Sequence, residues 1–190
     1  EDRPETDQLR KAAKLFQESG PELACIQCAL NYYNTNENFL TKMFTLEYTY
    51  WFDYLLPGLM ARGLPIPLGG TSNHFRTSAL QKVGGWDPFN VTEDADLGMR
   101  IVQYGYETQM LESTTYEEAN NSLGNWIRQR SRWLKGYMQT ALVHTRHPIK
   151  LIRTIGLYET AGFGMMVWGS PVAVLLAPIM WGFFVLWVLT

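Results

Sequence analysis

Residues 23–31, LACIQCALN, decide the fold class of this chain. This run is short, apolar and bounded by polar sequence, which is typical of a buried strand. Residues 5–19, directly before it, place apolar side chains at helical spacing, and Gly20-Pro21 ends that helix. A helix that leads into a buried strand predicts an α/β domain.

The same alternation continues along the chain. Residues 39–56 predict a helix that ends before Pro57-Gly58, with an apolar face of Phe39, Met43, Leu46 and Tyr50 and an aromatic content typical of a core. ETQMLES (107–113) predicts a second strand, and the following STTYEEAN (113–120) is assigned no more than a loop role. Residues 122–144 predict a long helix, so helices and strands alternate as in an α/β fold.

Composition excludes some classes of function. The formal net charge is only −2, so bulk charge does not favour nucleic-acid binding. Cys25 and Cys28 lie in the buried strand, where residues three apart point to opposite faces, and no second cysteine pair is present for a zinc site. We interpret both as small buried side chains rather than as metal ligands or a redox pair.

The end of the chain differs from the rest. Residues 162–190 contain no Asp, Glu, Lys, Arg or His, and an uncharged run longer than about 18 residues can span a bilayer. Pro171 and Pro178 predict a kink in this helix. The basic residues Arg146, Lys150 and Arg153 precede it and predict that this side faces the cytoplasm.

VTEDADLG (91–98) places Glu93, Asp94 and Asp96 at a predicted helix start, with Thr92 as its N-cap. Carboxylates in a first turn are stabilised by the helix dipole, which by itself explains them. A carboxylate at a loop-to-helix junction beside a cleft is also a candidate general base for a sugar hydroxyl. Position alone leaves both interpretations open.

The downstream helix carries NWIRQRSRW (125–133). Gln129, Arg132 and Trp133 stand at i, i+3 and i+4, which predicts that they share one face. An amide, a guanidinium and an indole can respectively bind a hydroxyl, pair with a phosphate and stack on a sugar ring. The alternative is an amphipathic helix lying on a membrane, and a site at a membrane surface would satisfy both interpretations.

TED at 92–94 and QRSRW at 129–133, followed by an apolar tail, resemble the T-E-D and Q-x-x-R-W motifs of membrane-embedded family 2 glycosyltransferases of the cellulose synthase and hyaluronan synthase type. The resemblance covers the whole chain. It implies the C-terminal half of a GT-A type domain over residues 1–122, interfacial helices over 123–160 and a truncated transmembrane segment over 161–190. These 190 residues alone are then expected to be inactive, with the catalytic part at the cytoplasmic face of the inner membrane.

The resemblance also implies roles for individual residues. Asp94 would be the general base of an inverting transfer from a nucleotide diphosphate sugar, with UDP-glucose the expected donor, and Glu93 would support it. Thr92, Gln129, Arg132, Trp133, Gly69, Gly70 and Thr71 would bind substrate, with Arg132 on the diphosphate and Trp133 beneath the acceptor sugar. Glu1 aligns with the second acidic residue of a D-x-D motif that binds a divalent metal, Mg²⁺ or Mn²⁺. Asp96 receives no catalytic role, because helix-start electrostatics accounts for it.

Other functions stay open at this point. A transferase that adds one sugar to a lipid or short acceptor would share these residues, and a membrane-anchored glycan-binding scaffold would not need Asp94 at all. A glycosidase that uses Glu93 or Glu117 with Asp94 is disfavoured, because hydrolysis needs no phosphate-binding arginine.

Overall fold

The computed structural model describes residues 2–190 and is built around one sheet. Its four strands are β1 (Arg3–Pro4), β2 (Leu23–Tyr32), β3 (Asn73–Phe75) and β4 (Glu107–Glu117), in the order β1-β4-β2-β3. The long strands β2 and β4 are parallel, whereas β1 and β3 run antiparallel to their neighbours. The predicted α/β class is therefore confirmed.

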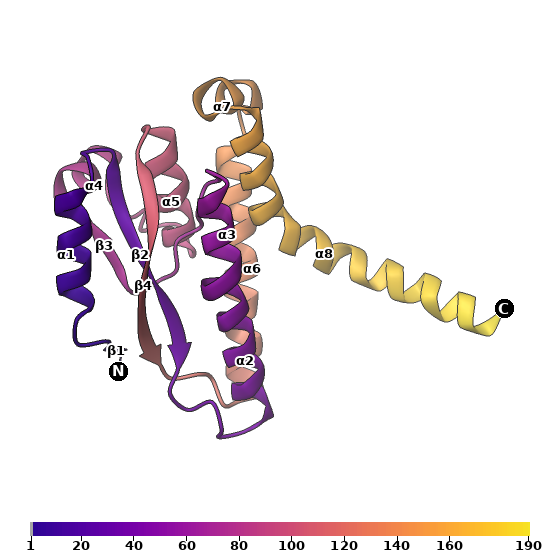
Figure 1. The fold of residues 1–190 in the computed structure, drawn as a ribbon. Coiled ribbons are helices and arrows are strands. Elements are labelled where there is room, and N and C mark those ends of the chain that lie inside the picture. The colour runs from indigo at the N-terminus through magenta and orange to yellow at the C-terminus, as the bar shows by residue number, and fades with distance from the viewer. Residues whose placement is uncertain (1) are drawn as a thin grey trace.

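Helices cover both faces of the sheet (Figure 1). On one side lies α1 (Gln8–Glu18), and on the other lie α2 (Phe39–Thr49), a π-helical turn η1 (Tyr50–Leu55), α3 (Leu56–Ala61) and α5 (Glu93–Gln103). The remaining helices are α4 (Thr77–Val83), α6 (Leu123–His144), α7 (Pro148–Ile155) and α8 (Leu157–Leu189). Strand β2 is buried on both faces, which is why its sequence is mostly apolar rather than alternating, with Gln27 and Asn31 as its polar residues.

The helix predicted over residues 39–56 continues past Pro57 to Ala61. The π-helical turn η1 lies immediately before Pro57, and a helix that changes its hydrogen-bond register there tolerates a residue without an N–H. The predicted apolar face is not the buried one, because Phe39 is 77% and Leu46 is 63% exposed. The buried face consists instead of Phe44, Phe52 and Leu56.

Strand β4 is longer than its predicted range. Thr114–Glu117 pairs with Ala29–Tyr32 of β2, so the segment assigned to a loop is the second half of a central strand. The polar sequence of residues 114–117 is not typical of a central strand, but a strand whose end borders a cavity does not need apolar side chains on both faces. The extension brings Glu117 beside the cavity described below.

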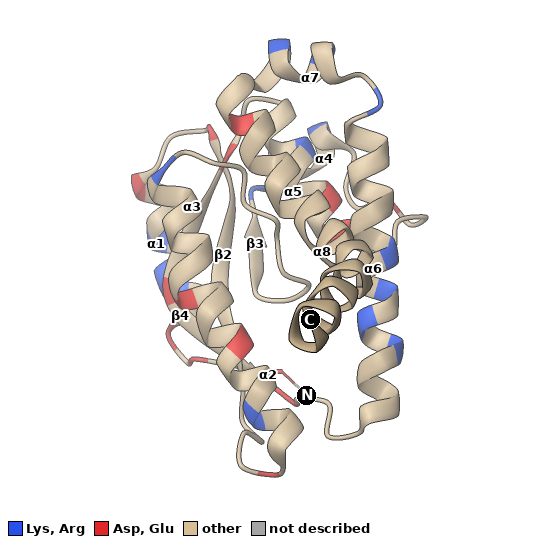
Figure 2. Ribbon diagram, turned by 90° about the vertical axis from the view of Figure 1, so that its right-hand side faces the viewer, with Lys and Arg blue, Asp and Glu red and all other residues tan. Residues whose placement is uncertain are grey.

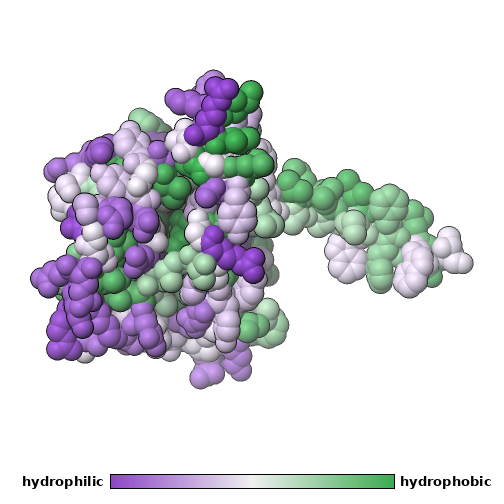
Figure 3. Space-filling view, turned by 45° about the horizontal axis from the view of Figure 1, so that its top comes forward, coloured by the Kyte–Doolittle hydropathy of each residue, from purple (hydrophilic) through white to green (hydrophobic). Residues whose placement is uncertain are grey.

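Helix α8 combines a packed start with an exposed end. Phe163 and Val167 are buried against Ala141 of α6 and Leu151 of α7. Beyond them the helix leaves the domain and presents an apolar surface (Figures 1 and 3). With 33 residues and a mean hydropathy of 2.4 in its most apolar window, it is long and apolar enough to cross a membrane.

Candidate active site

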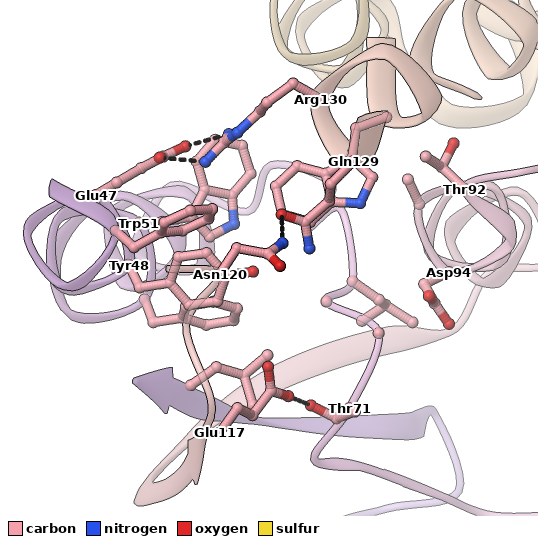
Figure 4. Close-up of a pocket in the computed structure, with 18 of the residues that line it drawn as sticks. Glu47, Tyr48, Trp51, Thr71, Thr92, Asp94, Glu117, Asn120, Gln129 and Arg130 are labelled. Carbon is pink, nitrogen blue, oxygen red and sulfur yellow. Dashed lines mark hydrogen bonds and ion pairs between the residues drawn. The ribbon is translucent and has the colours of Figure 1, made fainter. Parts of the chain in front are cut away.

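A cavity of about 400 Å³ lies where the carboxyl end of β2 meets α2, α5 and α6. Its polar lining includes Thr71, Asp94, Glu117 and Gln129, drawn in Figure 4. Its apolar lining is largely aromatic: Tyr32, Phe44, Tyr48, Trp51, Phe52, Trp133 and Tyr137. A wall of rings with polar groups at its edge suits a ligand that has both apolar faces and hydroxyl groups.

Asp94 lies in the first turn of α5, directed toward this cavity (Figure 4). The indole Nε1 of Trp86 donates to its Oδ1 at 3.1 Å. Burial, reinforced by the neighbouring Glu93, raises the pKa of Asp94 to about 6, and the Trp86 bond only partly opposes this shift. A carboxylate with this pKa is mostly ionised at neutral pH yet a stronger base than an ordinary aspartate, as a general base requires.

The loop of Gly69, Gly70 and Thr71 forms the side of the cavity next to Asp94. Buried Gln27 of β2 holds this loop, because its Oε1 accepts from the Gly69 N–H at 2.8 Å and its Nε2 donates to the Thr71 carbonyl at 3.2 Å. A Cβ at Gly70 would stand 3.4 Å from Oδ2 of Asp94. Glycine at this position therefore leaves the space beside the carboxylate open.

Glu117, which sequence reasoning did not assign to the site, stands at the end of β4 and accepts a hydrogen bond from the Thr71 hydroxyl. Burial raises its pKa, and the Thr71 bond opposes that shift. The signal that could have revealed it is the strand alignment, since carboxyl ends of neighbouring parallel strands meet at one edge of a sheet. Asp94 and Glu117 thus bring carboxylates to the cavity from two separate elements, α5 and β4 (Figure 4).

On α6, Gln129, Arg132 and Trp133 do not share one face as predicted. Gln129 and Trp133 line the cavity together with Tyr137, whereas Arg132 is exposed outside the lining. Adjacent residues in a helix are about 100° apart, so Arg132 and Trp133 point in different directions. Arg132 instead joins Arg128 and Lys135 on the basic edge of α6 (Figure 2).

Arg130 is the basic side chain that lines the cavity. It pairs with Glu47 of α2, with Nη1 2.6 Å from Oε1. Its guanidinium also lies over the rings of Phe44 and Trp133, with its carbon 5.1 and 4.7 Å from the two ring centres. Nearby, Gln129 accepts from Asn120 at 3.0 Å. The Arg130–Glu47 pair holds α6 against α2 (Figure 4), and the guanidinium packs on the Trp133 ring.

Thr92 occupies the N-cap position of α5, but its side chain makes no capping bond. Its hydroxyl instead lies 3.4 Å from that of Thr140 on α6, which also accepts from the Asn90 amide at 2.9 Å. The predicted N-cap position is therefore confirmed, but the Thr92 side chain does not cap the helix, because packing against α6 takes it away from the helix end. Gly136 permits this close approach of α6 to Thr92.

The predicted metal ligand, Glu1, lies outside the described residues. Within residues 2–190, no group of three or more His, Cys, Asp or Glu side chains could hold a metal ion. Both cysteines are buried free thiols, and burial raises the pKa of Cys28 to about 11. The described residues thus do not by themselves form a metal site.

Comparison with known proteins finds glycosyltransferases in each case. The family model described as "Glycosyl transferase family group 2" matches residues 1–190. The probable glycosyltransferase YdaM of Bacillus subtilis is 30% identical over 63% of this chain and 29% of its own length. A probable glucomannan 4-beta-mannosyltransferase of Arabidopsis thaliana is 28% identical over 70% of this chain and 24% of its own length.

A beta-monoglucosyldiacylglycerol synthase of Trichormus variabilis is 28% identical over 72% of this chain and 29% of its own length. The matched regions therefore span between about a quarter and a third of these relatives.

Proposed function

The chain belongs to glycosyl transferase family group 2, and from this premise we propose that its cavity binds the acceptor sugar of an inverting transfer from a nucleotide diphosphate sugar. The observation that carries the proposal is the half-buried carboxylate of Asp94, with its raised pKa, in the lining of an aromatic cavity of about 400 Å³. A sugar ring stacks its apolar face on aromatic rings while its hydroxyls bind polar groups at the edge.

The proposed reaction follows from this placement. Asp94 removes the proton of the acceptor hydroxyl, whose oxygen forms a bond to the anomeric carbon of the donor as the bond to the diphosphate breaks. Glu93 supports Asp94 as a base, because its neighbouring negative charge raises the pKa of Asp94, while Gly69, Gly70 and Thr71 position the acceptor with Gln129 and Trp133. The exposed Arg132 contacts the leaving diphosphate, since a guanidinium forms charge-assisted bonds to phosphate oxygens. Family 2 enzymes generally use a divalent metal, and we expect Mg²⁺ or Mn²⁺.

We further propose that the protein works at a membrane surface. Helix α8 would cross the bilayer, and residues 123–160 would lie along the cytoplasmic face. Support comes from α7, where Lys150 and Arg153 are exposed beside exposed Ile149 and Ile152, a composition that suits the boundary between headgroups and acyl chains.

The product is proposed to be a β-linked glycan extended from a UDP-sugar, with UDP-glucose the expected donor. Relatives named as glucomannan mannosyltransferases favour glycan extension. The relative named as a glucosyldiacylglycerol synthase favours the second candidate, one sugar added to a lipid. The two candidates differ in product length rather than in the role of Asp94.

The test uses the full-length protein in membranes with Mg²⁺ or Mn²⁺ and a panel of UDP- and GDP-sugars. We expect one donor to release nucleoside diphosphate, and sizing the product separates a polymer from a single addition. If no donor is turned over while glycans still bind, the protein is a scaffold and the transferase proposal fails.

Trp133→Leu tests the acceptor role of the indole. We expect KM for the acceptor to rise about 5- to 20-fold, equivalent to about 1–2 kcal/mol of lost contact, with a smaller change in kcat. Steady-state kinetics over a range of acceptor concentrations measure both. The matched control is Trp126→Leu, since Trp126 also contacts Arg130 but does not line this cavity. Equal effects of the two variants would contradict sugar stacking on Trp133.

A further inference from the structure

Asp96 is buried and bonded, so helix-start electrostatics does not account for it. Its side chain is 5% exposed, and each of its oxygens has a partner on a different turn or helix. Arg100 Nε donates to Oδ2 at 2.7 Å, and His144 Nε2 lies 2.7 Å from Oδ1. These bonds outweigh the effect of burial and lower the pKa of Asp96.

We assign the tautomer of the His144 ring from its two hydrogen-bond partners. The Gln103 amide lies 2.9 Å from Nδ1, and its NH₂ group donates there. Nδ1 is then an acceptor, so the ring proton is on Nε2 and is donated to Asp96. His144 is at the C-terminal end of α6, the helix that carries Gln129 and Trp133. This link therefore joins α5 to the helix that forms the acceptor side of the cavity.

Arg100 extends the network in the other direction. Its Nη1 donates to the carbonyl of Val83, the last residue of α4, at 2.8 Å. Gly84 and Gly85 follow, and then Trp86, whose indole donates to Asp94. Asp96 thus connects the first turn of α5, which carries Asp94, to two other elements. Through Arg100 it is linked to the loop of residues 84–86, and through His144 it is linked to α6.

We propose that Asp96, Arg100 and His144 are positioning residues that set the distance and direction between the Asp94 carboxylate and the acceptor bound at Trp133. This inference rests on the proposed function of Asp94 as the base. The three side chains do not line the cavity, so they act through the elements that they join. A general base must lie within hydrogen-bond reach of its proton, and a shift of about 1 Å costs about 100-fold in rate.

The test compares four variants of the full-length protein in membranes. His144→Leu removes the donor to Asp96, whereas His144→Gln retains an amide donor and should rescue. Gln103→Leu is milder, because it removes only the amide that donates to His144 Nδ1 and leaves the ring free to place its proton on either nitrogen. Arg100→Met cuts the link to Val83. The control is Arg146→Gln, an exposed residue near the same helix end.

We expect His144→Leu to lower kcat by about 10- to 100-fold with donor KM unchanged, Gln103→Leu to lower it less, and His144→Gln to stay near wild type. Arg100→Met should also move the acidic limb of kcat/KM to higher pH, because Asp94 loses the Trp86 bond that lowers its pKa. The other charged groups lining the cavity, Glu47, Glu93, Glu117, Glu118 and Arg130, are unchanged in all variants.

Wild-type kcat and an unchanged acidic limb in Gln103→Leu and Arg100→Met would overturn the proposal, and so would equal losses in His144→Leu and His144→Gln. If the wild type transfers no sugar, the proposed function fails separately. A cryo-EM structure of Arg100→Met then tests whether Arg100 controls the position of Trp86. A retained hydrogen bond from Trp86 to Asp94 would contradict the proposal.

Discussion

Asp94→Asn is expected to lower kcat for sugar transfer by about 10²- to 10⁴-fold, the usual contribution of a general base. The amide has nearly the same shape but cannot take the acceptor proton at any working pH. Substrate binding should change little, so the loss should fall on kcat rather than on KM. Diphosphate release by the full-length protein in membranes measures both constants.

The matched control is Asp53→Asn, which makes the same change of charge at an exposed position outside the cavity. It should leave kcat within about twofold, as is usual for surface substitutions. Wild-type activity in Asp94→Asn would remove Asp94 from the mechanism and leave Glu117 as the carboxylate to test.

The pH dependence of kcat/KM gives an independent test of Asp94 as the general base. Because Asp94 acts in its ionised form and its pKa is raised to about 6, kcat/KM should fall as the pH is lowered through about 6. An ordinary aspartate would place this limb near pH 4. The residual activity of Asp94→Asn should lack the limb, and an unchanged limb in that variant would assign it to another group.

Gly136→Ala is expected to give the second largest effect. A Cβ at this position would stand 2.8 Å from the backbone nitrogen of Thr92, so α6 and the start of α5 must separate. Overpacking of this kind destabilises a fold by about 1–3 kcal/mol. Because Thr92 directly precedes Glu93 and Asp94, we also expect kcat to fall about 10- to 100-fold. Thermal unfolding and steady-state kinetics of the full-length protein measure the two effects.

Gly124→Ala on the same helix is the control. Its Cβ would meet nothing closer than Arg128 Nη1 at 3.9 Å, so the change should stabilise α6 by about 0.5–1 kcal/mol through helix propensity. If Gly136→Ala keeps full activity and stability, the close contact between α5 and α6 does not set the geometry of the site.

Several features were predictable because they depend on local chemistry. The short, mostly apolar run of β2 predicted a buried strand, and the uncharged sequence after residue 161 predicted the apolar helix α8. TED and QRSRW predicted the family, which the match over residues 1–190 confirms. The same motifs named Asp94, Gln129 and Trp133, which the structure brings to one cavity.

Other features depend on how distant segments pack, and the sequence did not predict them. Arg132 and Trp133 are adjacent in one motif, yet only the position of α6 against α2 decides that Trp133 faces the cavity and Arg132 does not. Glu117 looked like a loop residue until its pairing with β2 was known. Asp96 looked like a helix-start charge until His144, 48 residues away, was placed beside it.

The division has a physical reason. Periodicity, charge and motif chemistry are carried by neighbouring residues, so the sequence by itself determined the α/β class, the apolar tail, the family and the candidate base. Which side of a helix faces a cavity, which strand ends beside it and which buried charges are paired depend on contacts between segments tens of residues apart. These were decided only by the tertiary structure, because each is set by packing and by the need to satisfy polar groups removed from water.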